Sequence, residues 1–414
     1  MKRRAVQEYL QGRNQSYFGR IILLTGARSS GKETIVRHCF PDYTYLSVEN
    51  PAQHEKYQMM TTAQWRECYP LTIVDDVQKL PQIIDQIQST TELFLEPKYI
   101  LLTSGKLSSK EQILLSKRNT IIEVFPLTLP ELATTSAEDT IYASFFQRYM
   151  KGAKDVDALP ASLTADLRHV KKMEAFQFYL QYGGYPALTA ENMNDKKRRK
   201  WLDAYVKTFL EQDIRDFVSL RHLTPFIKTQ QYLAHNTDSI MNYSFISKEA
   251  DVSVPTAQRY VRHLEDCFQL ILLPPWVANS SKKLVKSPKI HFLDHGVLQT
   301  VLQKQGSLAK NELKSAIVSE IYKQIKNSQL PVSCYHLSTL DGRTIDVLLE
   351  TPKYYIAIVV KMADRVNHTD ARHLIDLQRI LDKPLKQSFV LSNDPQTRDL
   401  GDNIVATHVA TFLG

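Results

Sequence analysis

The chain has 414 residues, and its 52 Lys and Arg residues against 44 Asp and Glu residues give a formal net charge of +8. With 43% hydrophobic and 23% charged residues, the composition is that of an ordinary globular protein and excludes disordered and collagen-like chains. At roughly 150 residues per domain, the length predicts about three domains. Glycine is scarce, at 13 residues, so a cluster of glycines indicates a backbone that needs them.

We expect neither a secretory signal nor a membrane span. The first residues are charged without an apolar stretch behind them, unlike a signal peptide, and no run of about 18 apolar residues occurs. The four cysteines lie far apart without a Cys-x-x-Cys pair, which fits neither a disulfide framework nor a zinc knuckle. We interpret them as buried thiols of a cytoplasmic protein.

The N-terminal third predicts a parallel sheet, in a domain expected to span residues 1–135. Between Arg20 and Leu132, helical stretches alternate with short apolar runs, which are residues 21–24, 45–48, 71–74 and 99–102. Continuous apolar strands separated by helices are typical of a parallel sheet covered on both faces.

A phosphate-binding loop follows the first of these strands. Its residues are Gly26, Ala27, Arg28, Ser29, Ser30, Gly31 and Lys32, and a helical stretch beginning with Glu33 and Thr34 comes next. In this context backbone N–H groups and the helix N-terminus cradle phosphates, while the lysine reaches the β and γ groups. The alternative is a tight turn before a helix. The loop predicts ATP binding by residues 26–34.

One residue after the loop departs from the usual pattern. That position ordinarily supplies a Ser or Thr hydroxyl to Mg²⁺, and here it is Glu33. Thr34 does not simply replace it, because adjacent helical positions point about 100° apart. A carboxylate can ligate the metal, but it repels a triphosphate by on the order of 4 kcal/mol at 4 Å for an effective dielectric of about 20. ATP hydrolysis is therefore left open.

Two acids end the third predicted strand. An apolar run that stops at Asp75 and Asp76 is the second half of a nucleotide hydrolase: Asp75 is the candidate Mg²⁺ ligand and Asp76 the candidate general base for water. The alternative is a helix N-cap. At the base position an aspartate is one methylene shorter than a glutamate, and a misplacement of about 1 Å can cost roughly a hundredfold in rate.

Residues 136–236 predict a helical domain, and residues 237–305 a winged helix. We interpret the basic run Lys196–Lys200 as a solvated helix face. Ser244 and Ser253 are candidate N-caps of two helices, and the second is followed by an apolar run, 270–273, that ends at two prolines. Helix, turn, helix and strand in this order are typical of a winged helix.

The last segment, residues 306–414, predicts a small α/β domain. A helix begins near Asn311, strands are expected at 347–349, 356–360 and 388–391, and a further helix is expected near 370–381.

With these motifs the chain resembles the predicted prokaryotic AAA+ superfamily ATPases that carry a C-terminal nuclease-like domain of unknown function. The resemblance extends over nearly the whole length. It rests on the loop Gly26–Lys32, the strand Tyr45–Val48, the block Asp75–Pro81, Thr103-Ser104-Gly105, the segment Pro126–Leu132 and the turn Gly183-Gly184-Tyr185-Pro186.

The resemblance implies further roles for the N-terminal domain. Thr103 or Ser104 would be the polar sensor of the γ-phosphate, although the family's Thr-Gly-Ser order is inverted here. Arg118 would be an arginine finger, which acts on a neighbour's site and implies a homo-oligomer. Taken alone, Arg118 is a surface charge.

For the C-terminal domain the resemblance implies a restriction-endonuclease-like fold, in which three carboxylates and a lysine bind Mg²⁺ and activate water. This chain keeps Asp346 and Lys361 but has Ser315 and Val359 where the two glutamates belong. One carboxylate gives a divalent cation too few oxygen ligands. We therefore expect an inactive nuclease fold with a binding or structural role.

Three functions follow. The first is an ATP-binding AAA+-like protein, a slow ATPase or nucleotide-dependent switch that acts on DNA or a protein partner. The second is a non-hydrolysing interaction module. The third is a DNA-binding regulator whose winged helix offers phosphates a basic stripe, made of Gln258, Arg259, Arg262, Lys282, Lys283, Lys286 and Lys289.

Overall fold

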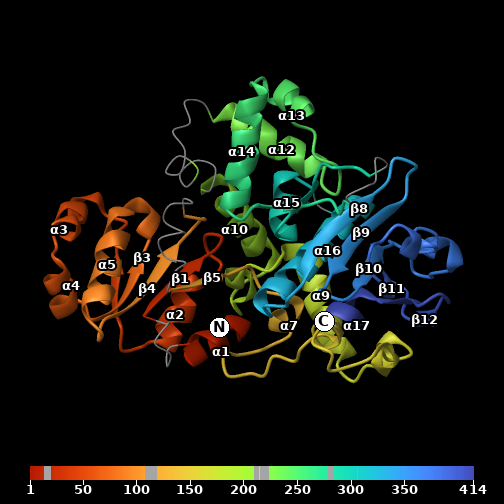
Figure 1. Ribbon diagram of the computed structural model, residues 1–414, viewed down its shortest axis with the longest axis horizontal. Coiled ribbons are helices and arrows are strands. Elements are labelled where there is room, and N and C mark those ends of the chain that lie inside the picture. Colours follow the sequence, from red (N-terminus) through yellow and green to blue (C-terminus); the bar gives the residue numbers. More distant parts are fainter. Residues whose placement is uncertain (14–19, 108–118, 209–213, 215–222, 278–283, 305) are drawn as a thin grey trace.

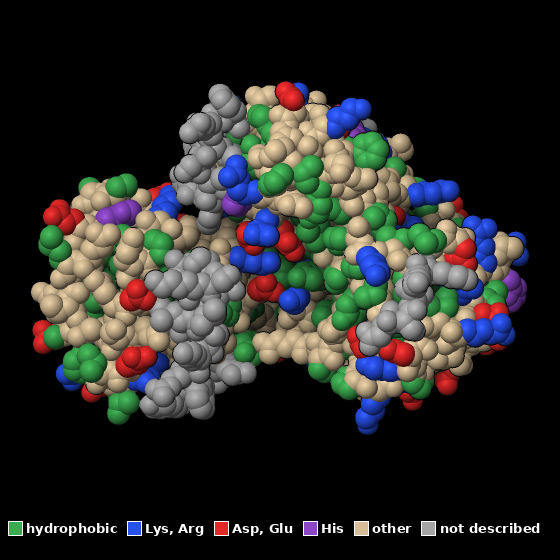
Figure 2. Space-filling model, turned by 45° about the horizontal axis from the view of Figure 1, so that its top comes forward, with side chains coloured by type: hydrophobic (Ala, Val, Ile, Leu, Met, Phe, Trp, Pro, Cys, Tyr) green, Lys and Arg blue, Asp and Glu red, His purple; other side chains and the backbone are tan. Residues whose placement is uncertain are grey.

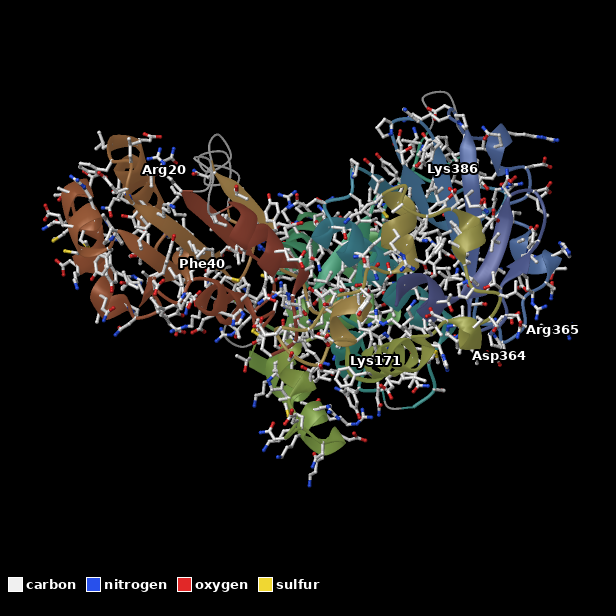
Figure 3. All side chains as sticks on the ribbon, turned by 90° about the horizontal axis from the view of Figure 1, so that it is seen from below. Arg20, Phe40, Lys171, Asp364, Arg365 and Lys386 are labelled. Atoms are coloured by element: carbon white, nitrogen blue, oxygen red, sulfur yellow. The ribbon has the colours of Figure 1, made fainter. Side chains whose placement is uncertain are left out.

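The computed structural model describes residues 1–13, 20–107, 119–208, 214, 223–277, 284–304 and 306–414. Two sheets lie at opposite ends of the molecule, with helices between them (Figure 1). From below, the N-terminal sheet forms one lobe that carries Arg20 and Phe40, and the C-terminal sheet lies in another that carries Lys386 (Figure 3).

The N-terminal sheet has five parallel strands in the order β2-β3-β4-β1-β5. They are β1 (Ile21–Thr25), β2 (Thr44–Ser47), β3 (Leu71–Asp75), β4 (Lys98–Thr103) and β5 (Thr120–Glu123). The first four confirm the predicted strands; β5 was not predicted.

Helices cover both faces of this sheet, as predicted. Ile22 and Leu24 of β1 face α1 (Ala5–Arg13) and α2 (Lys32–Cys39), and Ile21 and Leu23 face the opposite side, because successive strand residues point to opposite faces. The helices on that side are α3 (His54–Gln58), α4 (Thr62–Cys68) and α5 (Gln82–Leu93).

The middle of the chain is helical. Its first helices are α7 (Leu129–Leu132), α8 (Phe145–Met150), α9 (His169–Tyr182) and α10 (Asp195–Thr208). The basic run Lys196–Lys200 lies on α10, and its side chains are exposed or half-buried, which agrees with a solvated face. On the side of the molecule in Figure 2, basic and acidic side chains are interspersed among polar and apolar ones.

Further helices and an antiparallel strand pair follow. The elements are α12 (Thr224–His235), α13 (Tyr243–Ala250), α14 (Val254–Asp266), β6 (Leu270–Leu273), β7 (Lys289–Phe292) and α15 (His295–Val301). Ser253 caps α14 as predicted. The predicted cap Ser244 was wrong: α13 begins one residue before it, and the Asn242 side chain accepts from the N–H groups of Ser244 and Phe245.

The C-terminal part is a six-stranded sheet in the order β12-β13-β11-β10-β9-β8. Its strands are β8 (Ser333–Ser338), β9 (Thr344–Glu350), β10 (Tyr355–Val360), β11 (Leu385–Ser392), β12 (Arg398–Asp399) and β13 (Ile404–His408). It packs against α16 (Lys310–Asn327) and α17 (Val409–Leu413). The predicted helix near 370–381 was wrong: two 3₁₀ turns stand there, separated by Asp376 at φ +56°, a left-handed conformation that no α-helix continues through.

No helix in the described part of the chain combines the length and apolar character needed to cross a bilayer. The cysteines are thiols, but not all are buried as expected. Cys267 is buried and Cys39 and Cys334 partly so, whereas Cys68 is exposed at the end of α4. Burial raises the pKa of Cys39 to about 11 and that of Cys334 to about 12.

Candidate functional site

The predicted phosphate loop joins β1 to α2. Gly31 has φ +93°, where L side chains are strained. The backbone at Gly26 passes so close to the segment after β5 that an added Cβ would lie 2.1 Å from the carbonyl oxygen of Val124. Both glycines of the motif are therefore needed by the backbone itself, one for the turn and one for the close approach.

A cavity of about 930 Å³ opens beside this loop, within the range of small-molecule sites. The loop and the start of α2 contribute Arg28, Ser29, Gly31, Lys32, Glu33 and Thr34, and the end of β3 contributes Asp75 and the residue after it, Asp76. The two sequence motifs thus meet at one cavity. Among the other predicted site residues, Gly26, Ala27, Ser30 and Thr103 are buried and do not line it.

Lys32 lies at the start of α2 with its side chain buried. Its ammonium group donates to the carbonyl oxygens of Gly26 at 3.0 Å and Ala27 at 2.8 Å. A phosphate oxygen in the cavity is a stronger acceptor than these neutral carbonyls. Lys32 is therefore placed to exchange loop carbonyls for a bound phosphate.

Asp75 ends β3 with both carboxylate oxygens engaged. One oxygen accepts from the Tyr45 hydroxyl at 2.6 Å and the other from the N–H of Asp76 at 2.8 Å. Burial raises the pKa of Asp75. Asp76 has φ +59°, and its carboxylate accepts from the Gln78 amide at 2.9 Å.

The donor set at this cavity fits Mg²⁺. The metal is usually held by one or two carboxylates together with substrate phosphates and water, and the Asp75 and Glu33 side chains both line the cavity. Asp75 would hold the ion through its carboxylate. Oxygen ligands beyond these would come from the nucleotide and solvent.

Glu33 is paired, which the sequence reasoning missed. Its carboxylate lies 2.8 Å from Arg37 Nε, one helical turn on. The Arg37 guanidinium stacks 3.7 Å from the centre of the Tyr45 ring, whose hydroxyl binds Asp75. The i, i+4 spacing of an acid and a base on a predicted helix was the available signal. The unusual acid thus belongs to a chain of contacts that leads to the metal candidate.

Of the two sensor candidates, Ser104 lines the cavity. Thr103 is 1% exposed, and its hydroxyl donates to the Gly105 carbonyl at 3.0 Å. Arg118, the candidate finger, lies outside the described residues.

The opposite wall comes from the helical part of the chain, in residues 186, 187 and 189–192. The turn before it anchors this wall: the Gly184 N–H donates to Asp294 at 2.7 Å and its carbonyl accepts from Leu127 at 2.7 Å. A Cβ on Gly184 would lie 2.4 Å from the Leu127 oxygen. Sequence reasoning noted the turn but could not place it at the phosphate loop, because the contact is not local in sequence.

The N-terminal residues Met1, Lys2 and Arg4 also line the cavity that opens beside the phosphate loop. They belong to none of the sequence motifs, so they were not predicted.

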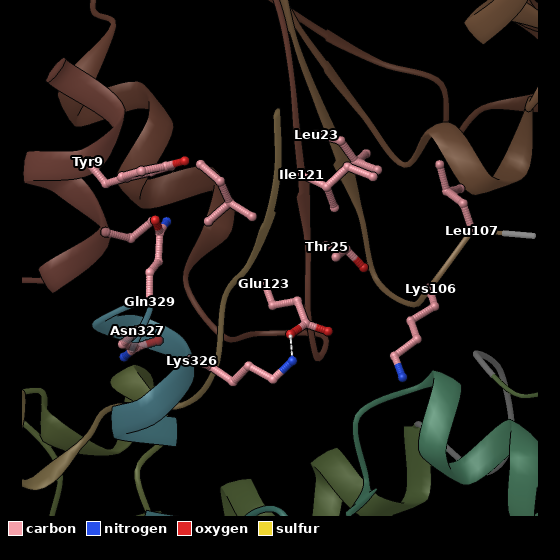
Figure 4. Close-up of a pocket in the computed structure, with 12 residues that line it drawn as sticks. Tyr9, Leu23, Thr25, Lys106, Leu107, Ile121, Glu123, Lys326, Asn327 and Gln329 are labelled. Carbon is pink, nitrogen blue, oxygen red and sulfur yellow. Dashed lines mark ion pairs between the residues drawn. The ribbon is translucent and has the colours of Figure 1, made fainter. Parts of the chain in front are cut away.

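A second cavity, of about 630 Å³, lies beside β5, where Glu123 pairs with Lys326 at 3.3 Å (Figure 4). None of the predicted site residues lines it.

The residues that the resemblance aligns with a nuclease centre, which we expected to be inactive, do not fit a divalent cation. One oxygen of Asp346 accepts from the Lys314 ammonium at 2.8 Å and the other from the Val360 N–H at 2.8 Å. Lys289 lies 3.8 Å from Asp346 and 3.1 Å from Asp238. Lysine ammonium groups thus already neutralise the carboxylate that a metal would need. Among the described residues, no group of three or more His, Cys, Asp or Glu could hold a metal.

The two substituted positions take structural roles. The Ser315 hydroxyl accepts from the Thr237 hydroxyl at 2.9 Å and from the Phe292 N–H at 3.2 Å. Val359 is 3% exposed in the core beneath the sheet.

Two mycobacterial proteins are similar to most of this chain. The uncharacterized protein Rv2008c of Mycobacterium tuberculosis is 23% identical over 367 residues, which cover 86% of this chain and 74% of that protein. The uncharacterized protein Mb2031c of Mycobacterium bovis matches with the same figures.

Solved structures give weaker likenesses. The Walker-type ATPase PABY2304 of Pyrococcus abyssi matches with a TM-score of 0.39 and 11% identity, over 72% of this chain and 95% of that one. A DNA polymerase III gamma subunit-related protein of Thermotoga maritima matches with a TM-score of 0.24 and 15% identity, over 63% and 99%. We draw no functional argument from likenesses this distant.

Three family models match successive parts of the chain. Residues 173–308 and 312–412 match models described as domains of unknown function, DUF8612 and DUF4143. Residues 19–133 match the model described as AAA domain. The N-terminal part of this protein is therefore an AAA-like P-loop domain of the nucleotide-binding kind.

Proposed function

We propose that this protein binds ATP with Mg²⁺ in the cavity between the phosphate loop and residues 186–192, and acts as a nucleotide-dependent switch. One observation carries the proposal: the loop, Asp75 and a wall from outside the AAA sheet line the same cavity. A ligand held there touches both parts of the molecule, so it favours the arrangement in which both walls are close.

Each residue of the site then has a role. Backbone N–H groups at the start of α2, together with Lys32, hold the phosphates. Asp75 holds Mg²⁺, which when bound neutralises charge on the phosphates. Ser104 is the better placed of the two γ-phosphate sensors, because it lines the cavity.

The geometry of the site supports ATP hydrolysis less well than ATP binding. Asp76 would orient water, but its carboxylate is short and is bound by Gln78. Geometry of this kind favours slow turnover, since small displacements of a catalytic group cost large factors in rate. A Mg²⁺-dependent ATPase activity that disappears in Asp75→Asn would exclude the alternative of a non-hydrolysing interaction module.

Calorimetric titration of the full chain with ATP, with and without Mg²⁺, tests binding. Lys32→Ala should abolish measurable affinity. Lys172→Ala is the matched control, because Lys172 is equally buried, at 7% exposed, but pairs with Asp166 away from the cavity. Unchanged affinity in Lys32→Ala would refute the proposal.

A second candidate function is DNA binding by a winged helix formed by α13, α14 and the β6–β7 pair. Gln258, Arg259 and Arg262 are exposed on α14, and Lys286 is exposed before β7. Lys282 and Lys283 lie outside the described residues, and Lys289 is buried against Asp238, so it drops out of the predicted stripe. The test is to measure the affinity for a DNA duplex at several salt concentrations. The logarithm of the affinity should fall linearly with the logarithm of the salt concentration, and no binding at low salt would refute DNA binding.

The arginine finger implies a third measurement. If Arg118 acts on a neighbouring copy, the protein assembles when ATP is bound, and sedimentation with and without ATP should differ. An unchanged monomer would leave Arg118 without that role.

A further inference from the structure

The first residues of the chain cross directly over the phosphate loop. Arg4 is 3% exposed, and its guanidinium donates to the Ser30 carbonyl of the loop at 2.8 Å and to the Phe125 carbonyl beyond β5 at 2.6 Å. An added Cβ on Gly31 would lie 3.4 Å from Arg4 Nη1. One side chain therefore connects the N-terminal segment, the loop and the chain that leaves the sheet.

The third partner of Arg4 is a buried carboxylate. Arg4 Nε lies 3.2 Å from Glu131, which is 1% exposed. The same carboxylate accepts from the N–H of Ala5 at 2.9 Å and from the N–H and hydroxyl of Thr128 at 2.9 and 3.2 Å. Three groups besides Arg4 thus hold Glu131 in place, and the same side chain caps the start of α7. Arg4 is held by a fixed anchor.

We propose that Arg4 is a positioning residue of the nucleotide site, which holds the phosphate loop in its binding shape. The proposal rests on the proposed function and adds residues that precede the matched AAA domain. A carbonyl oxygen that turned toward a phosphate would repel it, whereas the N–H groups that follow attract it. By accepting from Arg4, the Ser30 carbonyl is kept occupied, and the backbone of the loop is fixed at the residue just before Gly31 and Lys32.

Arginine is the residue type that this position needs. Its planar group presents several donors in fixed directions, and a lysine has one compact ammonium. Here the donors reach a loop carbonyl, a strand-end carbonyl and a carboxylate at once. The Glu131 charge offsets that of Arg4, so the expected effect on nucleotide affinity comes from loop geometry more than from added positive charge.

The test is calorimetric titration of full-length variants with MgATP. Arg4→Met combined with Glu131→Gln removes both charges and keeps an acceptor oxygen for the Thr128 N–H. We expect this double variant to fold and to bind MgATP about tenfold more weakly or worse, since the loss of hydrogen bonds from a charged group has effects of that order. Arg4→Lys keeps the charge but not the fork, and should lose a smaller factor.

The matched control removes a buried ion pair elsewhere. Lys172→Met with Asp166→Asn deletes a pair 2.7 Å apart in which Lys172 is buried and Asp166 partly buried. This control variant should have a lower melting temperature and an unchanged affinity for MgATP. The Arg4 variants should bind MgATP more weakly even at temperatures where they are fully folded. Affinity loss in this control as large as in the Arg4 double variant would overturn the proposal.

The outcomes separate the two claims. If the wild-type chain does not bind MgATP, the proposed function fails. If the wild type binds through Lys32 and the Arg4 double variant binds equally well, only the role of Arg4 fails. Should the double variant not fold, Arg4→Lys decides, and unchanged affinity in that variant overturns the positioning role.

Discussion

At the scale of single residues, the glutamate after the phosphate-loop lysine has a compensating partner. Glu33 was expected to repel a triphosphate. Its pairing with Arg37 at 2.8 Å, and the stacking of Arg37 on Tyr45, place a positive charge beside it. Both side chains of the pair are about half exposed, so solvent screens the interaction and its contribution is small.

Removing Arg37 should therefore weaken ATP binding modestly. We expect Arg37→Ala to lose about threefold in affinity at low salt and less at high salt, because salt screens exposed charges. Adding Glu33→Gln to this variant should restore the affinity, since the uncompensated carboxylate is then gone. Titrations at two salt concentrations measure both effects, and equal affinity of Arg37→Ala and wild type would contradict the compensation.

At the scale of elements, three of the buried histidines lie within or at the ends of elements of the central and C-terminal parts and have a pKa that burial lowers to a similar value. His295 begins α15, His336 lies in β8, and His408 caps α17 by accepting from the Ala410 N–H at 3.0 Å. Burial lowers the pKa of each from 6.5 to about 4. The folded protein therefore keeps these rings neutral where the unfolded chain protonates them.

Stability should fall as the pH is lowered from 6.5 through 4. Above pH 6.5 both states hold neutral rings, so the full stability is present; below it the unfolded state binds more protons. At pH 5 each histidine costs on the order of 2 kcal/mol by this linkage. Urea unfolding at pH 7.5 and pH 5 measures the loss. His408→Asn keeps a good helix cap and should give a flatter pH dependence; an unchanged slope would exclude a contribution from His408.

Local patterns predicted the elements that are apolar and regular. The strands β1, β3 and β4 contain the apolar runs that predicted them. The strands β5 and β8 mix polar with apolar residues, and they were not predicted. The apolar spacing of Ala371, Leu374, Leu377 and Leu381 imitates a helix, but these residues pack under the sheet from two 3₁₀ turns and the irregular backbone beside them. Tertiary packing overrode the period there.

The candidate site divides in the same way. Lys32 and Asp75 belong to contiguous motifs, so their spacing reveals them. Arg4, Tyr45 and Pro186 reach the same cavity from distant parts of the sequence. No single sequence pattern encodes that meeting, because it depends on how the sheet and the helical part pack.

At the scale of the whole molecule, the family boundaries do not separate the hydrophobic cores. Leu127 and Leu129, within the AAA match, lie in one cluster with residues of α9, α16 and the C-terminal sheet. Buried polar groups reinforce this junction: Lys323 donates to the Leu127 carbonyl at 3.0 Å, and Glu320 accepts from the Leu129 N–H at 2.8 Å. The parts therefore stabilise one another.

A fragment of residues 1–135, the expected N-terminal domain, should consequently behave poorly by itself. It would expose the apolar Leu127–Leu132 segment to water and lose the hydrogen bonds of this segment to α16, each with a net value of about 0.5–1.5 kcal/mol. We expect aggregation on size-exclusion chromatography and weakened MgATP binding relative to the full chain. A monodisperse fragment with full affinity would show that the AAA part is independent after all.

The distribution of thiols gives each matched region its own reporter. Cys39 and Cys68 lie in the AAA match, Cys267 in the middle region and Cys334 in the C-terminal one. A thiol reagent should modify exposed Cys68 at once and the partly buried Cys39 and Cys334 more slowly, whereas buried Cys267 should react only when its segment opens, since buried thiols react through local unfolding. Labelling rates followed by mass spectrometry would then read the opening of every region in the unmodified chain, with and without nucleotide.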